Sequence, residues 1–229
     1  MKRNKSSLGW YEIACDGLEL KKCRQDPRFP YLVTLARATN ALNLWSAILP
    51  HIQDVSSPAG ARDIWNSFFF TCAILYEALD LTRKMGKAFV NDAQYQNGIR
   101  KFLKDPRAKR VEHPSWKPVR NHAVFHFDPN WFSQQLEKAD FGECIFVRGE
   151  GKSKKGVYYP LADEVALESL VGLPIESEDF EQEMRARAKD TTQFAIEFAN
   201  EAEMLIGYAL REWGFKFAHI PSGITSSKA

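Results

Sequence analysis

One short stretch of the chain combines the side chains that phosphodiester chemistry requires. Residues 116–128 contain Arg120, Asn121, His122 and His126 within about four helical turns. Histidine takes up and releases a proton near neutral pH, and arginine carries a permanent charge on a planar fork of donors that matches a phosphate. This pairing suits RNA cleavage without a metal ion. His126 would assist proton transfer at a ribose 2′-OH, Arg120 would stabilise charge on the phosphoryl oxygens, and Asn121 would orient a ligand or the local backbone.

The phase of an α-helix limits how these residues can meet. Val119 and Ala123 belong to the apolar stripe of the expected helix, with Arg120 at one edge and His126 at the other. In one straight α-helix Arg120 and His126 lie roughly 9 Å apart along the axis and about 120° apart around it. A cleft, or a second copy of the helix across a dimer axis, would bring them together more easily.

The order Arg120, Asn121, four further residues and His126 resembles the Arg-x(4–6)-His signature of HEPN domains. Residues 119–128 look like the corresponding segment of the AbiU2-like group, which is associated with abortive infection. The resemblance covers residues 116–128, and the helical layout from about 30 to 213 is compatible with it. Five residues separate Arg120 from His126 where four are commoner, and a β-hairpin is not part of the minimal fold.

The resemblance implies a four- to five-helix bundle, usually dimeric, with the motif at the dimer cleft. It also implies a metal-independent endoribonuclease, a toxin of a toxin–antitoxin or phage-defence system, in which Arg120 and His126 are catalytic and Asn121 supports them. The implied partners are RNA, a second copy of the chain and an antitoxin protein, with no cofactor and no metal. Some HEPN domains are non-catalytic, so the alternative is a helical interaction or RNA-binding module in a defence or regulatory system.

Charge is polarised locally although the whole chain carries only +2. Residues 100–120 contain eight Lys or Arg and two acids, and residues 163–183 contain eight acids and no Lys or Arg. The basic run directly precedes the motif, where an RNA backbone would need it. We therefore expect substrate contacts from four side chains, namely His122, Lys117, Lys109 and Arg110. The other interpretation of each run is a solvated surface, and the acidic run can also dock a basic partner or cap the helix that follows.

Two further interpretations of the motif stay open. His122 and His126 are four residues apart, the spacing of a helical metal site that His113 and Asp128 would complete, but Ala123 stands where an HExxH motif needs glutamate. In a purely structural alternative, Arg120 pairs with Asp128 or a neighbouring glutamate, and His126 is a hydrogen-bonded interhelical residue.

Apolar spacing predicts a mainly α-helical protein, an antiparallel bundle with a small β-hairpin insertion. Residues 1–28 are left without an assigned structure, residues 29–217 form one domain, and residues 218–229 form a frayed tail. The hairpin is expected at about 142–161. Helices are expected at residues 30–52, about 59–88, 91–103, 116–127, 129–138, 161–170 and 177–213.

Cysteine usage and hydropathy indicate the compartment. Cys15, Cys23, Cys72 and Cys144 form no CxxC pair, which favours a reducing environment over a disulfide scaffold or zinc ribbon. No signal peptide is recognised, and the longest apolar stretch, residues 68–76, is far shorter than the roughly 20 residues of a membrane span. We therefore expect a cytoplasmic protein without a membrane partner.

Overall fold

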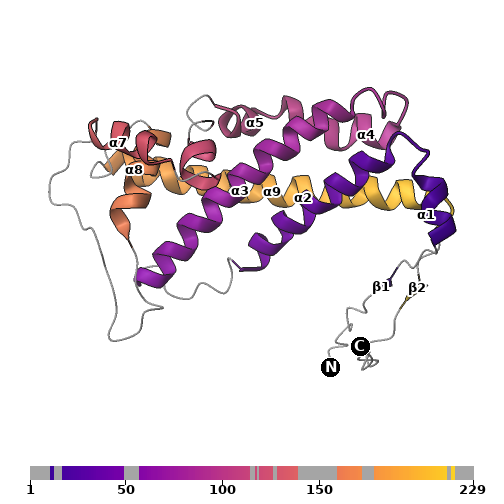
Figure 1. Ribbon diagram of the computed structural model, residues 1–229, viewed down its shortest axis with the longest axis horizontal. Helices are drawn as coiled ribbons and strands as arrows, with labels where there is room; N and C mark the ends of the chain where they lie inside the picture. Colours follow the sequence, from indigo (N-terminus) through magenta and orange to yellow (C-terminus); the bar gives the residue numbers. More distant parts are fainter. Residues whose placement is uncertain are drawn as a thin grey trace, which may run out of the picture.

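The computed structural model describes residues 11–12, 17–48, 57–113, 117, 119–125, 128–138, 159–171, 178–215 and 218–219. Three long helices dominate this part of the chain: α2 (Phe29–Ile48), α3 (Pro58–Met85) and α9 (Glu178–Glu212). In Figure 1, α3 and α9 both run away from the end that holds α8, while α2 runs in the opposite direction. The predicted mainly helical fold is confirmed.

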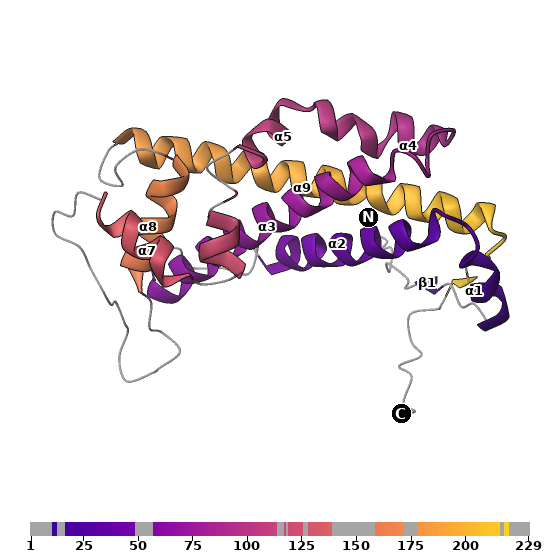
Figure 2. The same ribbon diagram turned by 45° about the horizontal axis from the view of Figure 1, so that its top comes forward.

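Shorter elements pack on these three helices, as Figures 1 and 2 show. Helix α4 (Ala93–Asn97), the 3₁₀ helix η2 (Ile99–Lys104) and α5 (Pro106–Val111) contact α9, and η2 and α5 also contact α3. The π-helix η3 (Val119–Phe125), α7 (Pro129–Leu136) and α8 (Pro160–Val171) lie at the N-terminal ends of α3 and α9. At the opposite end lie α1 (Gly17–Cys23) and an antiparallel pair, β1 (Tyr11–Glu12) with β2 (Ala218–His219).

Several helices start with an oxygen-bearing cap followed by proline. The side chains of Ser57, Asp105 and Asp128 accept hydrogen bonds from backbone N–H groups of the first turns of α3, α5 and α7. Proline follows each cap because its fixed φ suits the first helical position and its missing N–H has no partner to lose there. The predicted start at Asp128 is confirmed. Pro106 ends the preceding helical stretch as predicted but also opens α5, which the sequence pattern did not reveal.

Three regions differ from the sequence prediction or lie partly outside the described residues. The expected helix at 91–103 is divided into α4 and η2 at Gly98, whose backbone lies so close to Gln94 that a side chain at this position would clash with the Gln94 carbonyl. The expected hairpin at about 142–161 falls outside the described residues except for its last three, and Pro160 and Leu161 already belong to α8. In the tail expected to fray, residues 218–219 form β2, and residues 220–229 are outside the described part.

Apolar side chains on α9 connect two buried clusters. One cluster joins α2, the C-terminal half of α3, α4, η2 and α5 to the middle and end of α9, around Phe194, Phe198 and Leu205. The other joins the start of α3 to η3, α7 and α8, around Phe180 and Met184. The predicted core stripes of α3 and α9 are confirmed, and none of the described helices has the length and hydrophobicity needed to cross a membrane.

Arg28 holds three elements together at the end of α9. Its guanidinium lies 2.8 Å from an oxygen of Asp26, 2.9 Å from Glu212 of α9 and 3.5 Å from Asp92, the cap of α4. Trp213 donates a hydrogen bond from its indole N–H to Asp26 over 3.0 Å. The hydrogen bond from Arg28 lowers the pKa of the Asp26 carboxyl from 3.8 to about 2.

This lowered pKa predicts an acid-sensitive contribution to stability. Folding favours ionised Asp26, so the stabilisation is complete above about pH 4 and disappears as the pH falls through about 2, a difference of about 2 kcal/mol. We expect Asp26→Asn to lower the free energy of unfolding at neutral pH and to make it less dependent on pH between 4 and 2. Urea titrations of both proteins across this range measure the difference, and parallel curves would show that the Asp26–Arg28 contact contributes nothing in solution.

Candidate functional site

The candidate site is built on η3, which buried apolar residues attach to the body of the protein. Val119 is fully buried and Val124 nearly so, both in the cluster formed with the start of α3 and with α8. The sequence predicted an α-helix here, but residues 119–125 follow the wider i→i+5 hydrogen-bonding pattern of a π-helix. The α-helical phase that related Arg120 to His126 therefore does not apply to this segment.

Arg120 is held in place by three neighbours. Its guanidinium carbon lies 4.3 Å from the centre of the Tyr76 ring, a cation–π distance. Its Nε and one terminal nitrogen donate to Oδ1 of Asn121 over 2.9 and 2.7 Å, and the other terminal nitrogen donates to Oε1 of Glu77 over 2.5 Å. Tyr76 and Glu77 are consecutive residues of α3, so this helix determines where the charge of Arg120 lies.

Arg120 is largely shielded from solvent, whereas its partner Glu77 is exposed. The Arg120 side chain is only 14% exposed, whereas the Glu77 side chain is 57% exposed. A guanidinium carries five N–H bonds, and the contacts with Asn121 and Glu77 use three of them. Within the described residues, the other two find no acceptor. Arg120 is thus an anchored cation that retains donors for an anion, and a carboxylate already occupies the position that such an anion would approach.

Asn121 contacts the Arg120 guanidinium, whereas the side chains of His122 and His126 lie outside the described residues. The backbone of His122 belongs to η3 while its side chain is outside the described residues, as is all of His126. Among the described residues, no three His, Cys, Asp or Glu side chains gather in a way that would hold a metal ion. The side chains of His122 and His126 are outside the described residues, so a metal site formed by these histidines stays a prediction.

Three residues of the basic run before the motif are paired with carboxylates. Arg107 contacts Asp105 and Glu197, Lys101 contacts Glu201, and Arg110 contacts Asp190. Three of these acids belong to α9. Because they neutralise Lys101, Arg107 and Arg110, less positive charge remains on the basic run to attract an RNA backbone. Lys109 and Lys117 are exposed, and within the described residues neither has a carboxylate partner. Of the four predicted substrate contacts, these two lysines are therefore available to a phosphate.

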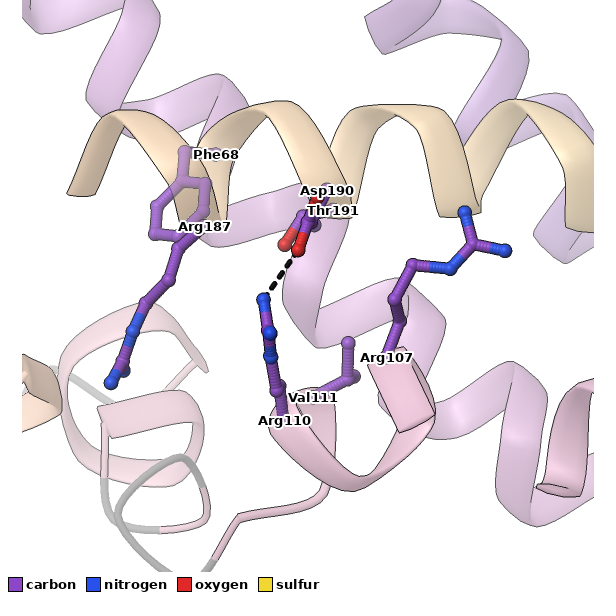
Figure 3. Close-up of a pocket in the computed structure, with 7 residues that line it drawn as sticks. All are labelled: Phe68, Arg107, Arg110, Val111, Arg187, Asp190 and Thr191. Carbon is purple, nitrogen blue, oxygen red and sulfur yellow. Dashed lines mark hydrogen bonds and ion pairs between the residues drawn. The ribbon is translucent and has the colours of Figure 1, made fainter. Parts of the chain in front are cut away.

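A small pocket between α5 and α9 gathers three arginines without focusing them on one point. Figure 3 shows Arg110 bonded to Asp190, with Arg107 and Arg187 extending away from it in opposite directions. Arg187 contacts Glu183 and the carbonyl of Leu170 instead. The floor includes Thr191, which lies 4.0 Å from the thiol of Cys72, and burial raises the pKa of that thiol. The pocket therefore offers neither a convergent anion site nor a reactive thiolate.

The partners of Arg120 on α3 were missed by the sequence interpretation. The structural alternative named Asp128 or a neighbouring glutamate; Asp128 caps α7, and the glutamate is Glu77, 43 residues before Arg120. Tyr76 and Glu77 lie beside the apolar stripe of α3. An aromatic residue and an acid at such positions do not indicate in the sequence which distant residue they contact. No sequence signal could have found them without the packing of η3 on α3.

No family model matches the chain, and no curated protein or solved structure matches it significantly.

The ion pair between Arg120 and Glu77 predicts a measurable coupling energy. In a double-mutant cycle of Arg120→Ala and Glu77→Ala we expect about 1 kcal/mol of coupling in the free energy of unfolding, because one partner is shielded and the other exposed. The Arg83–Glu112 pair, with side chains 45% and 22% exposed, provides a matched cycle elsewhere on α3 and should give a coupling of similar size. A coupling of zero for Arg120 and Glu77 would mean that the pair does not form in solution.

Proposed function

We propose that the chain is a metal-independent endoribonuclease of the HEPN type that acts as a homodimer, a toxin of a toxin–antitoxin or phage-defence system. The resemblance of residues 116–128 to the HEPN motif suggests the family, and the mainly helical fold is compatible with it. The observation that carries the proposal is the anchoring of Arg120 by Tyr76 and Asn121, with a further contact to the exposed carboxylate of Glu77.

The anchoring supports a role at a phosphate because of what it does to the guanidinium. Asn121 and Tyr76 fix its orientation, so little conformational entropy remains to be lost when an anion binds. Glu77 holds the terminal nitrogen that a phosphoryl oxygen would need, and its exposure lets it swing into solvent when a phosphate arrives. In the free protein, the Glu77 carboxylate would then occupy the position that the substrate phosphate takes on binding.

The proposed reaction divides between Arg120 and His126. His126 removes the proton of a ribose 2′-OH, the 2′ oxygen attacks the adjacent phosphorus, and the bond to the 5′ oxygen breaks as that oxygen gains a proton. The products are a 2′,3′-cyclic phosphate and a 5′-OH. Arg120 stabilises the charge that builds on the phosphoryl oxygens, and Lys109 and Lys117 attract the strand from positions before the motif.

A second candidate function is a non-catalytic helical interaction or RNA-binding module. It is favoured by the contacts that make Arg120 part of the packing between η3 and α3, and by the neutralisation of Arg107 and Arg110. On this view, the Arg120–Glu77 pair stabilises the fold and a partner protein supplies any chemistry. Cleavage by the purified chain distinguishes the two functions.

The nuclease proposal predicts cleavage of single-stranded RNA in the presence of EDTA. We expect Arg120→Ala to slow cleavage by about 10²–10³-fold and His126→Ala by about 10²–10⁴-fold, as for loss of an oxyanion donor and of a general base. The measurement is the rate of product formation on a labelled RNA, with the end groups identified. A strand carrying 2′-deoxyribose at the cleavage position should stay intact.

Arg83→Ala is the matched control, because it removes a more exposed arginine elsewhere in the structure, on α3, that is also paired with a glutamate. It should cleave at the rate of the unaltered protein. If the purified protein cleaves no RNA, or if His126→Ala cleaves as fast as the parent, the chain is not this kind of nuclease and the interaction module becomes the better account.

A further inference from the structure

A pocket close to the candidate site has a largely aromatic and aliphatic lining. It lies between α3, η3, α7 and α8, the elements grouped at the N-terminal ends of α3 and α9 in Figures 1 and 2. Three phenylalanines and three smaller apolar residues form most of its wall, namely Phe69, Phe70, Phe132, Val124, Ala162 and Ala166. Its volume of about 130 Å³ is much larger than one water molecule requires. The pocket therefore has room for a single ring system.

Two of these rings keep part of their surface accessible. Phe70 and Phe132 pack against the buried cluster of α3, η3, α7 and α8 but are only partly buried themselves. Trp131 lies at 86° to the Phe132 ring, and Trp45 stacks on Phe70 with ring centres 5.4 Å apart, so both rings are held in place. Rings that are fixed in this way offer a surface on which a flat ligand can stack.

Two polar side chains, Asn66 and Asp163, complete the lining. Asn66 donates one N–H of its amide to the carbonyl of Arg62 over 2.8 Å, and within the described residues nothing donates to its amide oxygen. Asp163 adds a carboxylate, whose two oxygens accept about four hydrogen bonds in all. Acceptors therefore outnumber the one remaining amide donor, and the pocket favours a flat ligand whose edge carries N–H groups.

A nucleobase with an exocyclic amino group meets both requirements. Its ring can stack on aromatic side chains, and its amino group can donate to an amide or carboxylate oxygen. Adenine combines that donor with a neighbouring ring nitrogen that accepts from an amide N–H, which is the pair that asparagine recognises. Uracil carries oxygens in place of the amino group and would set acceptor against acceptor. An aliphatic ligand would make no use of Asn66 or Asp163.

The pocket lies along the same two helices that hold Arg120. Phe70 precedes Glu77, the partner of Arg120, by two turns of α3, which is about 10 Å along the axis. Val124 lies in η3 together with Arg120. A strand whose phosphate is held at Arg120 can therefore place the base of a nearby nucleotide in the pocket.

We propose that this pocket binds an unstacked adenine of a single-stranded RNA, held by the phenylalanine rings and by hydrogen bonds to Asn66 and Asp163. It gives the protein a preference for adenine close to the phosphate at Arg120. The inference rests on the proposed function because it takes RNA as the ligand, but it requires only that RNA binds and not that it is cleaved.

The test compares the affinity of the purified full-length protein for two short 2′-O-methyl strands, one all uracil and one with a single adenine, by fluorescence anisotropy. These strands have no free 2′-OH, so binding is measured without cleavage. The strand with adenine should bind about 10-fold more tightly, as expected for one bidentate contact to a base. Asn66→Leu removes the amide at similar side-chain volume and should abolish most of this preference.

Ala162→Leu tests the pocket itself, because it fills the space from an exposed position of α8. It should weaken binding of the adenine strand about 10-fold and leave the uracil strand unaffected. Ala93→Leu is the matched control, since it makes the same change at an exposed position of α4, which Figure 1 places at the opposite end of the bundle. It should bind both strands as the unaltered protein does. Circular dichroism shows whether each variant keeps its fold.

The inference fails if the unaltered protein binds both strands equally or binds neither. It also fails if Ala162→Leu and Asn66→Leu keep the preference for adenine, or if Ala93→Leu loses it to the same extent. Cleavage of unmodified RNA decides the nuclease proposal separately. Adenine binding that depends on the pocket but is not followed by cleavage overturns only the nuclease, and cleavage that neither prefers adenine nor responds to Ala162→Leu overturns only the pocket.

Discussion

The buried stripe of α9 is the constraint on which the rest of the structure depends. Small residues such as Ala195, Ala199, Ala202 and Ala209 alternate along it with Phe194, Phe198 and Leu205, all nearly inaccessible to solvent. Alanine lets α2 and α3 approach the helix closely, and the larger side chains fill the space between them. Since 35 residues span about 52 Å, one helix supports both clusters. Loss of this stripe would separate η3 from the elements that position it.

The same helix also determines the electrostatics of the protein. Its outer positions carry Asp190, Glu197 and Glu201, which pair with Arg110, Arg107 and Lys101. The basic run, which the sequence suggested as a contact for an RNA backbone, thus partly serves to hold η2 and α5 against α9. Pairs of this exposure contribute little individually, so their larger effect is to leave the positive potential concentrated at a few lysines.

The contacts of Arg120 show that the position of this short motif depends on the packing of the long helices. Its neighbours Tyr76 and Glu77 come from α3, and the position of α3 is set by α2 and α9.

The sequence alone was sufficient for what local rules determine. Apolar residues at three- and four-residue intervals indicated α2, α3 and α9, because a helix that is buried on one side repeats its apolar residues with this spacing. Asp128 and Pro129 marked the start of α7, because a helix cap acts on residues within one turn of it. The tertiary structure alone decided the pairing of Arg120 with Glu77, the neutralisation of the basic run and the π-helical form of residues 119–125. The pairings join residues 43 to 100 positions apart, and residues 119–125 pack against α3, α7 and α8; contacts of this kind leave no periodic trace in the chain.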